Sequence, residues 1–204
     1  MQRVVWRQGR ALCTINPLTP LFIFAEFWDL GHKLFRSTPE TYPVTFIAGN
    51  AFDAKHLEIV PPFTKINPPP AAPAVLSELT SLNPLRGHIS AIYASSLFHL
   101  FQENEQLHLA RALGALLSPE PGSMIFGAHI GLPEKGLDQR RGDDQRGSFC
   151  HSPDSWTELW DGVVFEKGSV RVDAKVEEIK RDIQQFMGTE NMMVYGLFWS
   201  VTRL

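Results

Sequence analysis

Two histidines stand at places in the sequence where a side chain could take part in acid–base chemistry. His99 follows the apolar run Ile89–Ser95, and His129 stands near the end of the apolar run Met124–Ile130. An unperturbed imidazole has a pKa close to neutrality, so a histidine beside a hydroxyl or carboxyl group can remove its proton. A single histidine is also often a structural hydrogen-bonding group. The sequence leaves both roles open for each of the two.

The spacing of the histidines does not match that of metal ligands. His88, His99, His129 and His151 are far apart, and none belongs to an HExxH motif. Metal sites that can be recognised from sequence have ligands at short, regular intervals. The sequence therefore predicts no metal site, and it leaves His151, at a predicted helix start, with the same ambiguity as the other histidines.

A strand–helix–strand unit positions His99 and His129. The two apolar runs have the composition of buried strands, and the segment between them, from about Glu103 to Leu117, has the periodicity of a helix. The breaker Ser118–Gly122 ends that helix before the second strand begins. Two strands joined by a crossover helix pair in parallel with a right-handed connection, which predicts an α/β fold.

The carboxyl ends of parallel strands are where an α/β sheet binds its ligands. A further buried run, Val44–Ala48, is predicted to be another strand of the sheet. The candidate binding segments are those that follow the three strands, namely Asn50–Asp53, Ser95–His99 and His129–Gly131.

Other elements are predicted on both sides of this unit. Before it we expect a short strand at Leu21–Phe24, a helix at Glu26–Arg36 and a proline-rich connector, Ala54–Gly87, that holds a short helix at Ala74–Leu82. After it we expect a polar loop at Leu132–Phe149, a helix from Pro153 to about Trp160 with Ser152 as its N-cap, and two strands, Ser169–Ile179 and Met192–Thr202. The last two strands are expected to pair antiparallel at one edge of the sheet.

The totals restrict the class of protein. A chain of 204 residues predicts one domain, and a net charge of −3 lacks the basic surface that nucleic acid or an anionic membrane would need. No run approaches the ~20 apolar residues of a membrane helix. The two cysteines, Cys13 and Cys150, are too few for a disulfide framework, which favours a reducing, cytoplasmic location.

Five segments of the chain carry a family resemblance: FWDLGHKLF, TFIAGNAFD, IYASSLFHLF, LARALGALLSPEPGSMIFGAHIG and FCHSPDSWTELW. They resemble class I S-adenosylmethionine-dependent methyltransferases of fungal secondary-metabolite clusters, over about Glu26 to Leu204. The resemblance implies a Rossmann-like methyltransferase sheet with a reversed C-terminal β-hairpin. It also implies S-adenosyl-L-methionine as cofactor and O-methylation, on a carboxyl or phenol oxygen, of a small polyketide or meroterpenoid acceptor. It leaves a homo-oligomer open.

The resemblance assigns cofactor roles to residues at two strand ends. It implies that Asn50, Ala51 and Phe52 contact the adenine, and that Ser95 faces the methionine part of the cofactor. An Asn side chain can both donate to and accept from the adenine edge, and a Phe ring can pack on its face. The residues also allow an Asx-type turn with a core Phe, and a Ser that only fills space. His99 and His129 are the candidate proton acceptors.

Two features of the family pattern are missing from the N-terminal part of the chain. The family has a glycine-rich loop after its first strand and an acidic residue after its second. Here Gly9 stands alone, and Leu21–Ala25 is apolar. We therefore expect residues 1–24 to be a divergent segment before a methyltransferase-like domain at 25–204, with the first βα unit missing or atypical. Ala11–Ile15 is the candidate substitute for the first strand.

The missing features leave a second function open. The chain could be a truncated, catalytically inactive methyltransferase-like protein that acts, if at all, through a partner. A hydrolase is disfavoured because the sequence has no G-x-S-x-G nucleophile motif.

Overall fold

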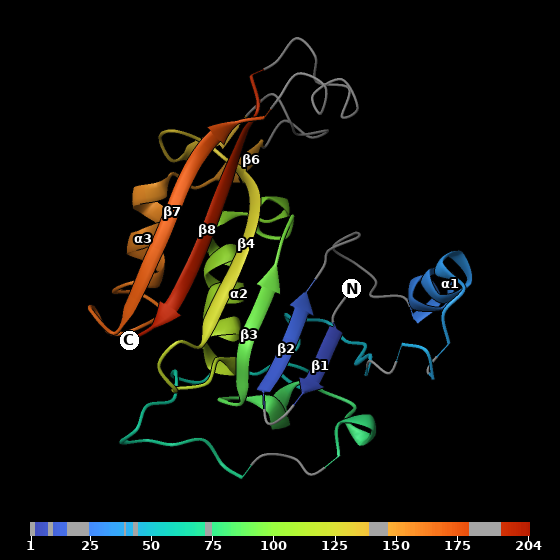
Figure 1. The fold of residues 1–204 in the computed structure, drawn as a ribbon. Helices are drawn as coiled ribbons and strands as arrows, with labels where there is room; N and C mark the ends of the chain where they lie inside the picture. The colour runs from blue at the N-terminus through green and yellow to red at the C-terminus, as the bar shows by residue number, and fades with distance from the viewer. Residues whose placement is uncertain are drawn as a thin grey trace.

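The computed structural model has a mixed six-stranded sheet in the order β1-β2-β3-β4-β8-β7 (Figure 1). It describes residues 3–7, 10–15, 25–38, 40–42, 45–71, 75–138, 147–179 and 193–204. The strands are β1 (Arg3–Arg7), β2 (Arg10–Ile15), β3 (Ile89–Ala94), β4 (Met124–Gly131), β5 (Gly136–Asp138), β6 (Ser148–Cys150), β7 (Val170–Glu178) and β8 (Tyr195–Arg203). The helices are α1 (Ala25–Phe35), α2 (Glu103–Leu116) and α3 (Pro153–Trp160), with 3-10 turns η1 (Leu76–Glu78), η2 (Asn83–Leu85) and η3 (Phe98–Leu100).

The predicted strand–helix–strand unit is confirmed. β3 and β4 pair in parallel, with Ile92 opposite Ile125, and α2 connects them. The reversed C-terminal hairpin is also confirmed, because β8 pairs antiparallel with both β4 and β7. The α/β fold class predicted from the sequence is therefore correct.

The place beside β3 is taken by a strand from the N-terminal part of the chain. β2 pairs in parallel with β3, from Leu12 opposite Ala91 to Ile15 opposite Ala94, and β1 pairs antiparallel with β2. This confirms that Ala11–Ile15 can substitute for a first strand. The strand predicted at Leu21–Phe24 lies outside the described residues.

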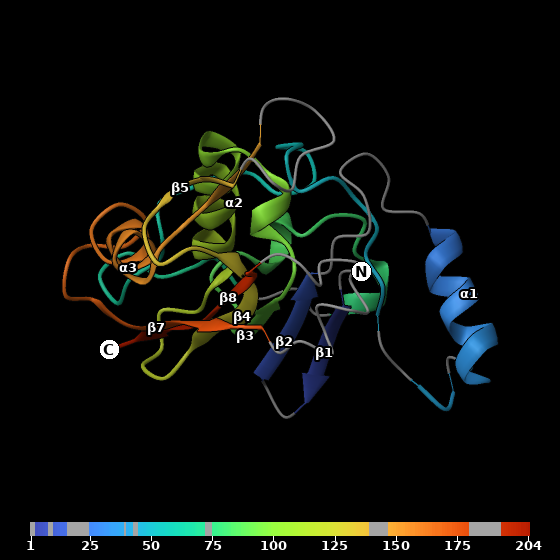
Figure 2. The ribbon, with the colours of Figure 1, turned by 90° about the horizontal axis from the view of Figure 1, so that it is seen from above.

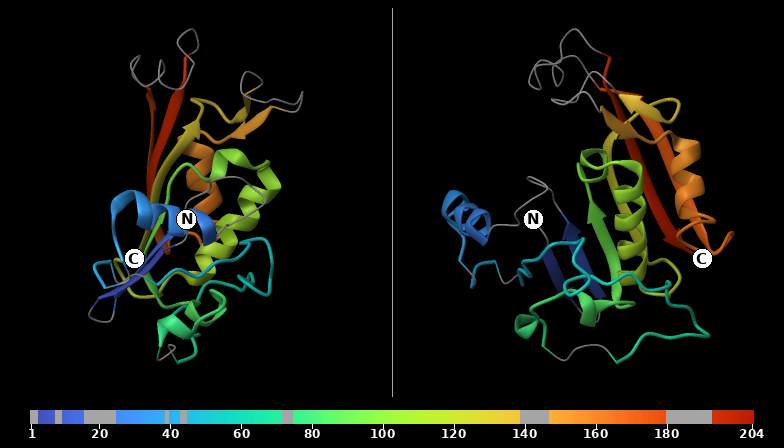
Figure 3. Two further views of the ribbon diagram at one scale, coloured as in Figure 1. Left: turned by 90° about the vertical axis from the view of Figure 1, so that its right-hand side faces the viewer. Right: turned by 180° about the vertical axis from the view of Figure 1, so that it is seen from behind.

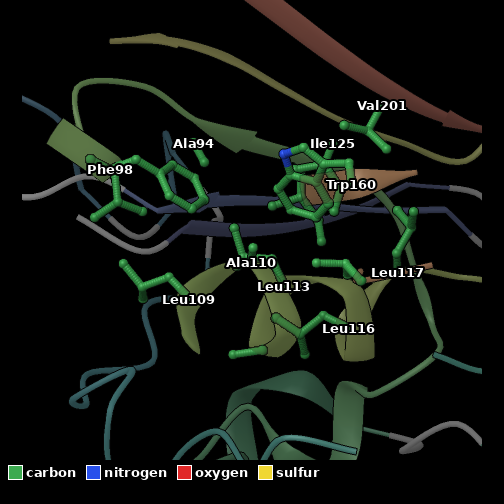
Figure 4. Close-up of a cluster of buried hydrophobic side chains, with 14 of the residues drawn as sticks. Ala94, Phe98, Leu109, Ala110, Leu113, Leu116, Leu117, Ile125, Trp160 and Val201 are labelled. Carbon is green, nitrogen blue, oxygen red and sulfur yellow. The ribbon is translucent and has the colours of Figure 1, made fainter. Parts of the chain in front are cut away.

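The core lies between the sheet and the helices α2 and α3. Leu109, Leu113 and Leu116 of α2 are buried in one cluster with Ile125 and Trp160 (Figure 4). The last turn of α2 is buried on all sides, since every residue from Ala112 to Leu116 is buried.

The start of α3 is as the sequence predicts. The Ser152 side chain accepts a hydrogen bond of 3.2 Å from the Ser155 backbone N–H, and Pro153 is the first helical residue. Ser152 therefore satisfies one of the backbone donors that every helix start leaves unpaired.

Three local predictions are wrong. Residues 46–50 form no strand, although Ile47 is buried, because a short apolar run can be buried in an irregular segment. Of the helix predicted at Ala74–Leu82, the structure has only the 3-10 turn η1 (Leu76–Glu78). The predicted polar loop contains a small hairpin, in which β5 pairs antiparallel with β6.

The two faces of the sheet are covered unequally. α2 and α3 lie on the same face, as the views from above and from behind show (Figures 2 and 3). No helix among the described residues covers the opposite face, where Tyr93 and Phe198 are 39% and 41% exposed. None of the described helices is long and apolar enough to span a membrane.

Gly127 allows the close approach of β3 and β4, which gives a first prediction. A β-carbon at this position would overlap the carbonyl oxygen of Ala94. We expect Gly127→Ala to lower the free energy of unfolding by about 1–3 kcal/mol, the usual cost of overpacking. Urea unfolding measures this loss. Gly136→Ala is the control, because nothing lies within 4 Å of its β-carbon. Equal stabilities of the two variants would contradict the prediction.

Candidate active site

The turn after β3 is tied to the neighbouring strand β4. The Ser95 hydroxyl donates a hydrogen bond of 3.0 Å to the Ala128 carbonyl oxygen, and the Ser96 backbone N–H donates one of 2.7 Å to the same atom. Ser96 has a φ of 52°, in the left-handed region. This turn directs the chain into η3, which carries His99.

The structure brings the two predicted histidines together. His129 lies in β4 and is buried, and His99 lies in η3 and is half-buried. Their rings stack with centroids 6.4 Å apart and an interplanar angle of 13°. Residues 30 positions apart in the sequence therefore form one histidine pair beyond the end of β3.

His129 is held in an aromatic environment. Trp199 of β8 donates a hydrogen bond of 3.0 Å from Nε1 to His129 Nδ1, and the Trp156 ring lies 4.8 Å from the imidazole, edge to face. Burial lowers the pKa of His129 well below its usual range, and the nearby His99 and His151 lower it further. His129 is therefore neutral near pH 7.

The hydrogen bond from Trp199 assigns the tautomer of His129. A neutral imidazole has one N–H and one acceptor nitrogen, so an Nδ1 that accepts places the proton on Nε2. His129 Nε2 is buried and has no hydrogen-bond partner among the described residues. This tautomer can donate a hydrogen bond, but it cannot accept a proton at Nε2. Of the two predicted proton acceptors, the geometry favours His99.

His151 has a role at the start of α3. Its Nδ1 lies 2.9 Å from the Ser155 hydroxyl, in the same group of side chains that caps the helix. Burial, with a smaller contribution from Lys135, lowers the pKa of His151 to about 4. These contacts support a structural role for this histidine.

Asn50, Ala51 and Phe52 form the compact turn that the sequence allows. Asn50 Oδ1 accepts a hydrogen bond of 3.0 Å from the Phe52 backbone N–H, which is an Asx turn. Phe52 is half-buried against Phe101 and His108, with ring centroids 5.0 and 5.2 Å away. The Asn50–Phe52 turn therefore packs against the N-terminal half of α2, next to η3. A contact with adenine stays a prediction.

Trp199 is the residue of this site that the sequence analysis missed. It lies opposite Gly127, two positions from His129 along β4, where a diagonal cross-strand contact is in reach. The alternation Leu197, Trp199, Val201 marks the buried face of β8 and could have revealed the contact. The described residues contain no group of three or more His, Cys, Asp or Glu side chains placed to hold a metal ion.

The tautomer assignment gives a second prediction. Trp199→Phe removes the N–H that His129 Nδ1 accepts and leaves a buried acceptor unpaired. Trp156→Phe is the matched control, because it touches the same ring while its own Nε1 has no hydrogen-bond partner among the described residues. We expect Trp199→Phe to cost about 1–3 kcal/mol more than the control in urea unfolding.

Nitrogen NMR of the imidazole gives an independent readout. The wild-type protein should show a protonated Nε2 and an unprotonated Nδ1 at His129, and Trp199→Phe should mix the two tautomers. A protonated Nδ1 in the wild type, or equal losses of stability in the two variants, would contradict the assignment.

Comparison of the sequence with known proteins reveals fungal methyltransferases. The chain is 32% identical over 144 residues to the O-methyltransferase phiE of a fungal species, which covers 70% of this chain and 39% of that protein. It is 30% identical over 129 residues to the asnovolin E/chermesin D methyltransferase nvfJ of Aspergillus novofumigatus, which covers 60% and 42%. It is 26% identical over 149 residues to the methyltransferase adrK of Penicillium rubens, which covers 72% and 45%. No protein-family model matches the chain.

Solved structures of methyltransferases also align with parts of the fold. A Haemonchus contortus phosphoethanolamine N-methyltransferase 2 with S-adenosyl-L-methionine aligns with a TM-score of 0.35 and 11% identity, over 58% of this chain and 34% of that one. An S-adenosylmethionine-dependent methyltransferase from Mesorhizobium loti aligns with a TM-score of 0.34 and 14% identity, over 58% and 63%. The chain spans about two fifths of the length of its fungal relatives. The sequence identities confirm the resemblance: over these stretches the chain is similar to fungal methyltransferases.

Proposed function

We propose that this chain takes part in S-adenosyl-L-methionine-dependent O-methylation of a polyketide or meroterpenoid intermediate in fungal secondary metabolism. The observation that carries the proposal is its 32% identity over 144 residues to a fungal O-methyltransferase. The acceptor atom is a carboxyl or phenol oxygen, as expected from the family resemblance. The two histidines beyond the end of β3 suit a phenol acceptor, which must lose its proton, whereas a carboxyl acceptor is already ionised near neutral pH.

The described residues fit one wall of a cofactor site. β2, β3 and β4 are neighbouring parallel strands, and their carboxyl ends meet at one edge of the sheet, the usual ligand position in such folds. Asn50 Oδ1 already accepts from Phe52, so its amide nitrogen is the group that would donate to the adenine ring. Phe52 would contact the face of the adenine, and Ser95 would face the methionine part.

The proposed acid–base roles are based on the geometry of the histidine pair. When bound, the cofactor supplies a methyl group on a positively charged sulfur. His99, half-buried beside the end of β3, would remove the acceptor proton. His129 would not take this part, because Trp199 occupies its Nδ1 and its Nε2, which carries the proton, is buried. Its ring would instead pack beside that of His99.

The alternative is a methyltransferase-like protein without activity that acts through a partner. The observation that favours it is the missing glycine-rich loop, because that loop lets the backbone approach the cofactor closely. Cofactor binding by this chain separates the two functions.

Titration calorimetry with S-adenosyl-L-methionine is the test of the proposed cofactor site. We expect the full chain to bind the cofactor, and Phe52→Ala to weaken binding roughly two- to tenfold through loss of one aromatic contact. Phe63→Ala is the control, because Phe63 is also half-buried and lies in the proline-rich connector. Absence of binding at millimolar cofactor would support the inactive alternative.

A methyl-transfer assay tests the roles of the histidines. With a phenol as acceptor, we expect His99→Gln to lower kcat by about 10²–10⁴, the usual contribution of a general base. With a carboxylic acid, which is already ionised near pH 7, we expect little change. The dissociation constant of the cofactor should stay unchanged, since His99 is assigned to the acceptor. His88→Gln, in the turn before β3, is the control. Wild-type kcat with the phenol in His99→Gln would refute the proposed base.

A further inference from the structure

The uncovered face of the sheet carries an apolar groove. It runs over the strands β4, β8 and β7, and its volume is about 690 Å³. Met124, Phe126 and Phe198 contribute its apolar lining, and Asp173 and Lys175 line it on the edge strand β7. Parallel α/β sheets normally have both faces covered, and an exposed apolar patch usually marks an interaction site.

The helix α1 carries a second uncovered apolar surface. Leu30 and Leu34, one helical turn apart, are 53% and 77% exposed. Trp28 lies on the opposite side of the helix, and its ring stacks on Phe46 with centroids 5.1 Å apart and an interplanar angle of 6°. One side of α1 is therefore packed against its own chain, while the leucine side is exposed and is covered by no other helix or strand that the structure describes.

We propose that two copies of this chain form a two-fold dimer in which α1 of each copy lies in the sheet groove of the other. Leu30 and Leu34 would enter the apolar part of the groove, next to Phe198. Binding of an amphipathic helix in an apolar groove is a common mode of recognition. When each of two copies places the same helix in the groove of the other, the result is a symmetric dimer.

The charges beside the two surfaces are complementary. Asp29 and Lys33 flank the leucines of α1 and are four residues apart, which is about 6 Å along a helix. Asp173 and Lys175 are two residues apart, which is about 6.6 Å along a strand. A helix lying along β7 can therefore place Asp29 beside Lys175 while Lys33 is beside Asp173.

The charges of β7 are available for such contacts. Asp173 is paired with Arg171 at 3.1 Å, and Lys175 with Glu177 at 2.7 Å, on the exposed surface of the strand. Exposed ion pairs of this kind contribute little to stability. Asp173 and Lys175 can therefore also form ion pairs with the docked helix.

The position of α1 favours a second copy over the same chain as occupant. α1 lies beyond β1, at the opposite end of the sheet from β7 (Figures 1 and 2). The groove of the same chain is separated from α1 by the strands β1, β2 and β3, and the contact of Trp28 with Phe46 holds the helix away from it. A partner copy can deliver its α1 without breaking this contact.

Sedimentation equilibrium of the full chain tests the dimer. We expect a dimer for the wild type and at least a tenfold higher dissociation constant for Leu34→Glu. Leu34 is exposed, so its replacement does not disturb the fold. Leu137→Glu, at an exposed leucine of β5, is the control and should leave the dissociation constant unchanged. A monomeric wild type at 100 µM (on the order of the concentration that a weak dimer needs), or a dimer that Leu34→Glu leaves intact, overturns the proposal.

Charge reversal tests the predicted register. Lys175→Glu should raise the dissociation constant, because it places a second carboxylate beside Asp29. The double variant Asp29→Lys with Lys175→Glu should restore the wild-type value. Failure of the double variant to recover overturns the assigned pairing.

Cross-linking identifies the occupant of the groove. A Leu34→Cys chain and a Phe198→Cys chain of different mass, mixed and oxidised, should give a disulfide between the two chains. The doubly substituted chain should likewise give linked dimers. A disulfide within a monomer would show that the same chain fills its own groove, which overturns the exchange between copies.

Discussion

The geometry of the candidate active site depends on the hydrogen bonds that the carbonyl oxygen of Ala128 accepts. It accepts hydrogen bonds from both Ser95 and Ser96, and so joins the turn after β3 to the side of β4. Gly127 makes this possible, because any side chain there would meet the backbone of Ala94. The direction in which the chain leaves β3, and with it the position of His99 over His129, follows from this backbone contact.

A second constraint is the tryptophan that faces His129. A buried imidazole far from water would be costly without a partner, and Trp199 supplies one while it also selects the tautomer. Trp156 and Phe98 complete an apolar enclosure in which a charged imidazole is disfavoured. The two histidines thus differ in their surroundings: His129 is held as one neutral tautomer by Trp199, whereas His99 lies half-buried in η3.

Much of the fold was predictable because its signals are local. The helical periodicity of α2, the Ser152–Pro153 start of α3 and the alternation of β7 each depend on a few neighbouring residues, and each is confirmed. The irregular course of residues 46–50 was not predictable, because tertiary burial of Ile47 looks the same in sequence as a strand. The candidate residues were predicted because they lie near the ends of predicted strands. Trp199 could be identified only once the register between β4 and β8 was known.

The connection between β2 and β3 has a consequence for how the chain folds. These two strands are neighbours in the sheet, yet residues 16–88 separate them, whereas β3, α2 and β4 follow one another closely. Closing a long loop costs more conformational entropy than closing a short one, and non-local pairing is slow. We therefore expect the β3–α2–β4 unit to form before the N-terminal strands pair with it. In such an intermediate the edge of β3 would be unpaired, which is the kind of edge that pairs with other chains.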